Sequence, residues 1–120
     1  MIYECEIKGV DEEEVIIEID GIEIVCFCNS GCNYSIGYHT TCELDLFGNL
    51  LIEESQEHVF LERKANTYSY NVVGVLDVEN KLLRSCIDFS INESAIWDFS
   101  YLDNKMVRVM VSRINIDFVQ

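Results

Sequence analysis

Apolar and polar residues alternate along most of the chain, a pattern typical of half-buried β-strands rather than of amphipathic helices. Over residues 2–8, Tyr3, Cys5 and Ile7 share one face, with charged residues between them. A similar alternation over residues 39–47 predicts another strand. Its expected inward residues are Cys42, Leu44 and Leu46.

The sequence Asp20-Gly21 lies between two apolar runs and predicts a β-hairpin, because a type I′ turn needs positive φ at both central positions. A two-residue loop fixes the register of the flanking strands. The predicted inward pairs are Ile19 with Ile22, Ile17 with Ile24, and Val15 with Cys26. On the other face Glu18 opposes Glu23.

The remaining elements follow from weaker patterns. Residues 50–64 are ambiguous, and 55–64 fit a short helix or an edge strand. Alternation returns at residues 68–76, and the turn after it leads into residues 82–91, which together predict a second hairpin. Asn92 can cap a short helix. The last predicted strand, 105–118, changes inward parity near Ser112-Arg113, which requires a β-bulge or a barrel corner.

About seven strands with one short helical insert predict an all-β fold, a single small antiparallel β-barrel, with a β-sandwich as the alternative. We expect residues 1–120 to form one domain. The motif Tyr3-x3-Ile7-x-Gly9 is echoed by Tyr68-x3-Val72-x-Gly74, which suggests an internal duplication of 1–48 and 66–119.

The second half, with a glycine-bearing strand, a hairpin, a helical insert and a closing strand after Leu102-Asp103-Asn104-Lys105, resembles the OB-fold in its order of elements. That resemblance covers about half of the chain and implies binding of oligonucleotides, oligosaccharides or proteins on one barrel face. The groove-lining cations of nucleic-acid binders are missing here.

The net charge limits the classes of partner that the protein can bind. Eight Lys and Arg against 22 Asp and Glu give a net charge of −14. A chain this acidic repels phosphate backbones and anionic membranes, and attracts basic partners. We therefore expect no nucleic-acid or membrane partner. The first residues lack the pattern of a signal peptide, and no apolar run is long enough to span a membrane, so we expect a cytoplasmic protein with reduced thiols.

Four of the six cysteines fall among residues 26–42, which raises the question of a metal site. Tetrahedral zinc sites usually use C-x2-C pairs, and none occurs. Alternation places most of the cysteines on inward faces, so we expect buried thiols and no cofactor or metal. If a metal did bind, its ligands would come from Cys26, Cys28, Cys32, His39 and Cys42.

No catalytic constellation is evident, because only His39 and His58 could act as a histidine base and nothing aligns them with a nucleophile. We expect a protein that is not an enzyme. Residues 29–38 instead have the Asn, Ser, Gly and Tyr composition of recognition loops, and residues 97–101 interleave aromatic and acidic side chains. The predicted partner-binding residues are Asn29, Asn33, Tyr34, Tyr38, Trp97, Asp98, Phe99 and Tyr101.

The leading hypothesis is a small binding module for a basic protein, in its most concrete form an immunity- or inhibitor-type protein. The alternative is an OB-like barrel that binds a small molecule or glycan, with Tyr68 and Tyr70 lining its pocket. A zinc- or thiol-dependent protein is the third hypothesis. For residues 97–101, the competing interpretation is that Trp97 and Phe99 close the end of the barrel.

Overall fold

A computed structural model describes residues 1–48 and 50–119 of the chain. Strands make up 56% of the structure and helix 7%, so the predicted all-β class is confirmed. The molecule is elongated, with extents of 42 × 30 × 24 Å. None of the helices in the described part of the chain has the length and apolar character needed to cross a membrane.

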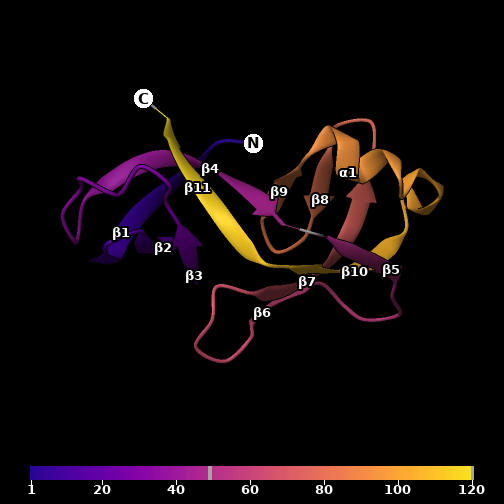
Figure 1. Ribbon diagram of the computed structural model, residues 1–120, viewed down its shortest axis with the longest axis horizontal. Coiled ribbons are helices and arrows are strands. Elements are labelled where there is room, and N and C mark those ends of the chain that lie inside the picture. Colours follow the sequence, from indigo (N-terminus) through magenta and orange to yellow (C-terminus); the bar gives the residue numbers. More distant parts are fainter. Residues whose placement is uncertain (49, 120) are drawn as a thin grey trace.

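Five strands close into a barrel on one side of the molecule (Figure 1). Antiparallel pairing joins β1 to β2 and β2 to β3, and β3 then meets β11 in parallel. Antiparallel pairing of β11 with β4, and of β4 with β1, completes the ring. The bounds are β1 Tyr3–Asp11, β2 Glu14–Ile19, β3 Ile22–Phe27, β4 His39–Phe47 and β11 Arg113–Val119.

The OB-fold is also a small five-stranded barrel, so the structure is consistent with the OB-like resemblance seen in the sequence. The sequence locates it in the second half of the chain. In the structure four strands of the closed barrel come from the first half, and only β11 comes from the second. Alternation identifies strands but not their non-local partners, which explains the difference.

The other side of the molecule is the rest of the same 11-stranded sheet, which we call the second sheet, in the order β9-β8-β7-β10-β5 with β6 also paired to β7. It joins the barrel where β9 runs parallel to the end of β4. The helical insert between β9 and β10 consists of α1 and the 3-10 turn η1. The bounds are β5 Leu51–Glu54, β6 Phe60–Arg63, β7 Tyr70–Asp77, β8 Leu82–Arg84, β9 Asp88–Ile91, α1 Glu93–Trp97, η1 Ser100–Leu102 and β10 Met106–Val111.

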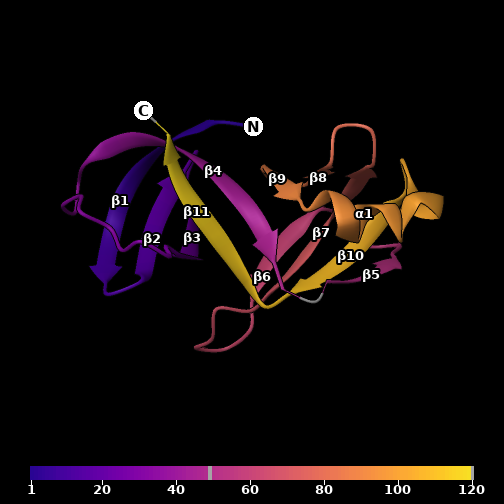
Figure 2. The same cartoon turned by 45° about the horizontal axis from the view of Figure 1, so that its top comes forward.

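The chain passes from the second sheet into the barrel at a sharp bend between β10 and β11, visible in Figure 2. Only Ser112 separates β10, in the second sheet, from β11, in the barrel. Val111 and Ile114 are both buried, so the predicted change of parity near Ser112-Arg113 is confirmed. The Ser112 amide donates to the carbonyl of Phe47 at 3.2 Å, which ties this bend to the end of β4.

The Asp20-Gly21 hairpin forms as predicted. Asp20 and Gly21 have φ values of 49° and 82°, which are the positive values that a type I′ turn requires. The observed pairs are Ile19 with Ile22, Ile17 with Ile24, Val15 with Cys26, and Glu18 with Glu23.

The described residues contain 11 strands, more than the seven or so predicted, because several predicted segments divide. Residues 50–64, ambiguous in the sequence, form β5 and the edge strand β6. The segment 82–91 breaks after Arg84, where the chain bends across Gly74; a Cβ on Gly74 would lie 2.9 Å from the Cβ of Ser85.

Two tyrosines join the barrel to the second sheet. The hydroxyl of Tyr70, on β7, accepts a hydrogen bond from the Val25 amide of β3 at 2.9 Å. The hydroxyl of Tyr3, on β1 of the barrel, likewise accepts a hydrogen bond from the Asp88 amide of β9, in the second sheet, at 2.7 Å. Tyr70 is therefore part of the core, which removes it from the pocket that the small-molecule alternative assigned to it.

Candidate functional site

The predicted recognition loop, residues 29–38, lies at the barrel end of the molecule. Its Tyr38 side chain is 50% exposed. Tyr34 is half-buried: its ring stacks on Tyr38 at 4.7 Å between centroids and meets Phe118 edge-on at 5.0 Å. Asn29 and Asn33 are exposed. The loop thus presents Tyr38 and the two asparagines to solvent, while Tyr34 also supports the barrel.

The second predicted segment, residues 97–101, belongs to the helical insert. Asn92 caps α1 as predicted, because its side-chain oxygen accepts a hydrogen bond from the Ser94 amide at 2.9 Å. Trp97 is 56% exposed and Tyr101 71%, and Asp98 is also exposed. Phe99 packs partly buried against the core. Of the two aromatics proposed to close a barrel end, only Phe99 packs inward.

Figures 1 and 2 place these two segments at opposite ends of the long axis. The eight predicted residues therefore do not form one surface. Three of them, Asn29, Asp98 and Phe99, lie at or beside a cleft in the middle of the molecule.

That cleft, which we call the waist cleft, has a volume of about 750 Å³. One wall is the end of the β4–β11 strand pair, and the other is the start of the helical insert. The polar and charged residues that line it include Asp45, Ser94, Asp98 and Arg113, and its aromatic residues are Phe47 and Phe99.

Arg113 occupies an unusual position beside the cleft. Its guanidinium lies between the rings of Phe27 and Phe47, at 4.0 Å and 4.2 Å from their centroids. Nε donates to Asn115 Oδ1 at 3.0 Å, and Nη2 donates to Asn29 Oδ1 at 3.5 Å. Within the described chain Arg113 forms no ion pair, although acidic residues outnumber basic ones.

Beside Arg113, the outward side of the β4–β11 pair is acidic. We call this surface the ribbon face: Glu43, Asp45 and Phe47 from β4, with Asp117, Asn115 and Arg113 directly opposite them on β11. Glu43 and Asp117 are thus a cross-strand pair of like charges. Burial, reinforced by the charges of Asp117 and Glu43, raises the pKa of Asp45 to about 6.

Four of the six cysteines are buried. Cys26 and Cys42 are fully buried, and Cys5 and Cys28 nearly so. Cys32 is half-buried and Cys86 is exposed. Burial raises the pKa of Cys26 well above its usual range. The prediction of buried thiols is therefore confirmed for the four that alternation placed inward.

Within residues 1–48 and 50–119, no group of three or more His, Cys, Asp or Glu side chains is arranged to hold a metal ion. His39 contacts Glu6 at 3.7 Å rather than a cysteine. The expected absence of bound zinc stays a prediction. Native mass spectrometry before and after chelation tests it directly.

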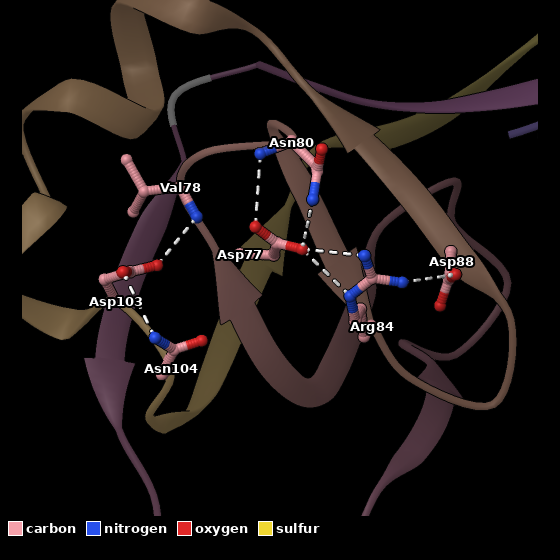
Figure 3. Close-up of polar contacts among 7 residues, drawn as sticks. All are labelled: Asp77, Val78, Asn80, Arg84, Asp88, Asp103 and Asn104. Atoms are coloured by element: carbon pink, nitrogen blue, oxygen red, sulfur yellow. Dashed lines mark hydrogen bonds and ion pairs between the residues drawn. The ribbon is translucent and has the colours of Figure 1, made fainter.

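A polar cluster at the far end of the second sheet has a structural role (Figure 3). Asp77 accepts hydrogen bonds from Asn80, which lower its pKa, and Arg84 bridges Asp77 and Asp88 at 2.7 Å and 3.3 Å. Nearby, Asp103 Oδ1 accepts the Val78 amide at 2.9 Å. These contacts fix the β7–β8 turn against the end of η1.

Sequence reasoning missed most of the waist cleft. Asp45, Phe47 and Arg113 belong to strands, and alternation marks them only as outward residues. The available indication was the pair of interruptions at Gly48 and Ser112-Arg113, since strand breaks at matching places bring outward side chains of both strands to one corner.

The family described as Uncharacterised conserved protein UCP019853 matches residues 1–119. No curated protein and no solved structure matches the chain.

Proposed function

The chain belongs to this family, whose description names no activity, and we propose that it is a binding module for a basic protein partner. The observation that carries the proposal is the ribbon face. Glu43 and Asp117 oppose each other there, with Asp45 beside them, and among the described residues the only cation within ion-pair distance of the three is the N-terminal amine, 3.7 Å from Glu43.

Like charges on directly opposite residues of paired strands destabilise a sheet, and a half-buried carboxylate adds to that penalty. Lysine or arginine side chains of a partner would relieve both effects on binding. The net charge of −14 would in addition attract such a partner from a distance.

The same face offers apolar contact. Phe47 is 45% exposed and projects from β4 on the side that carries Glu43 and Asp45. Aromatic residues are enriched at the centres of interfaces, and polar and charged residues surround them at the rim. A partner surface that is basic and partly apolar would therefore fit the ribbon face.

The concrete form of the proposal is an immunity- or inhibitor-type protein that occupies the basic, substrate-binding surface of a nuclease or toxin. We place this activity in the cytoplasm, where thiols stay reduced. The filled interior of the barrel supports surface recognition over enclosure of a ligand inside the barrel.

Affinity capture from the native host at low and high salt tests the proposal. The ribbon variant Glu43→Gln, Asp45→Asn, Asp117→Asn removes three charges from the ribbon face. A control variant, Glu12→Gln, Glu13→Gln, Glu79→Gln, removes three charges from exposed turns. We expect a basic protein to be retained at low salt by the wild type and the control but not by the ribbon variant. Equal retention by all three, or no retained protein, would refute the proposed surface.

A further inference from the structure

We propose that the waist cleft binds a small molecule that carries one anionic group, a carboxylate, on an apolar body, with Arg113 as its anchor. This inference goes beyond the proposed function, because it concerns a small-molecule ligand and a cation. The waist cleft shares Asp45, Phe47 and Arg113 with the ribbon face. The inference stands on the packing of Arg113, the shape of the cleft and the charges around it.

The guanidinium of Arg113 is fixed in an orientation that allows it to bind an anion. The two aromatic rings and the two asparagine oxygens fix the plane of the guanidinium, while Nη1 has no hydrogen-bond partner among the described residues. A guanidinium offers paired N–H groups that match a carboxylate, and a fixed one loses little entropy on binding. Arg113 is also the only basic residue among those described that line the cleft.

The rest of the lining is mixed, and part of it is apolar. Leu46, Leu50, Ala95 and Phe99 contribute to the walls, and Ser94 adds a hydroxyl at the rim. A volume of about 750 Å³ lies within the range of small-molecule sites. Such sites combine mostly apolar walls with a few polar groups that orient the ligand.

The carboxylates in the cleft limit the charge of the ligand. Asp45 and Asp98 line the same space, and Glu43 and Asp117 lie further along the ribbon face. These groups repel any anion, but they repel a single carboxylate less than a phosphate dianion or a polyanion, and a carboxylate can pair with Arg113 while its apolar part is directed away from them. A monocarboxylate is therefore the ligand class that the lining favours over a phosphate ester.

Benzoate is a suitable probe, with benzylamine as a cation of similar shape and inorganic phosphate as an anion without an apolar body. Amide and arginine Nε signals in NMR spectra report where each one binds. We expect benzoate to shift the Arg113 Nε signal and the amides of Phe47 and Ser94, with a Kd on the order of 1 mM for so small a molecule. We expect phosphate to leave these signals unchanged, and benzylamine to leave the Arg113 Nε signal unchanged.

Three variants complete the test. Arg113→Gln should weaken benzoate binding about tenfold or more, because a charge-assisted pair is lost. Arg63→Gln removes an arginine on β6 that likewise forms no ion pair among the described residues, and should have no effect. Ser94→Tyr should fill the cleft from an exposed position and weaken binding without touching Arg113.

Ser94→Tyr also keeps the test decisive if Arg113→Gln fails to fold. Undiminished benzoate binding by either folded variant would overturn the inference, as would an equal shift of the Arg113 Nε signal with benzylamine or phosphate, or no binding by the wild type. Arg113→Gln leaves all three ribbon carboxylates in place. Loss of benzoate binding with retained partner capture would therefore separate this site from the proposed partner surface.

Discussion

Gly48, the residue after β4, lies against Ser112, the residue between β10 and β11. A Cβ on Gly48 would lie 2.6 Å from the Cβ of Ser112, and Gly48 has a φ of 109°. There is therefore no room for a side chain at position 48 beside the bend between β10 and β11.

Gly48→Ala should destabilise the protein by about 1–3 kcal/mol, because it combines an unfavourable φ with an overlap against Ser112. Gly31→Ala is the matched control, since Gly31 has a φ of 75° but a Cβ added to it would meet no atom within 4 Å. Urea denaturation of both variants measures the difference. Equal losses would show that the contact with Ser112 contributes nothing to the stability of the corner.

Tyr70→Phe should reduce the free energy of unfolding by about 1–3 kcal/mol, because the buried Val25 amide loses its hydrogen-bond acceptor. Tyr101→Phe, at an exposed tyrosine, should leave stability unchanged within about 0.5 kcal/mol. Thermal or urea unfolding of the two variants provides the comparison. A loss for Tyr70→Phe no larger than that of the control would mean that this link between barrel and second sheet is not important for stability.

Asp45→Asn should stabilise the protein above pH 6 and have a decreasing effect as the pH falls toward 4. The pKa of Asp45 is raised from 3.8 to about 6 in the folded protein, so the folded state binds the proton more tightly than the unfolded state does. Wild-type stability contributed by this group is therefore present at low pH and lost as the pH rises through about 6, whereas Asn cannot ionise.

Urea denaturation of Asp45→Asn and wild type at about pH 8 and about pH 4.5 checks this prediction. Asp98→Asn, at an exposed carboxylate that lines the same cleft, is the matched control. A gain for Asp45→Asn that is the same at both pH values would contradict the ionisation argument.

Thiol titration of the native protein should detect Cys86 rapidly, Cys32 more slowly, and the remaining four only on unfolding. The reason is that the thiolate is the reactive form, and burial both blocks access and, at Cys26, raises the pKa. The kinetics of colour development with an aromatic disulfide reagent, with and without denaturant, measure this. Rapid modification of Cys26 or Cys42 in the folded state would show that the barrel opens.

Local sequence patterns predict much of this fold. The Asp20-Gly21 turn and its flanking alternation determine the register of β2 and β3, and the change of parity at Ser112-Arg113 predicts the corner. The interior position of the four buried cysteines follows from the same alternation.

The long-range arrangement does not follow from these patterns. Nothing local indicates that β11 enters the barrel of the first half, that β5 pairs with β10, or that Asp45 and Arg113 meet the helical insert. The internal duplication of 1–48 and 66–119 stays a prediction.

The relative position of the two predicted recognition segments also could not be predicted from the sequence. Composition draws attention to residues 29–38 and 97–101, but it carries no information on their separation, and the structure places them at opposite ends of the molecule. The ribbon face lacks any unusual composition, because its residues are the outward half of two ordinary alternating strands.

The salt dependence of affinity for the captured basic partner tests the central claim most directly. Titration of the purified partner against wild type, the ribbon variant and the control variant at about 50 mM and about 500 mM salt gives the required dissociation constants. We predict that the ribbon variant binds about tenfold or more weakly at low salt, that high salt removes most of this difference, and that the control stays within about twofold of wild type. Equal losses for the ribbon and control variants would contradict the claim, because binding would then follow total charge rather than the ribbon face.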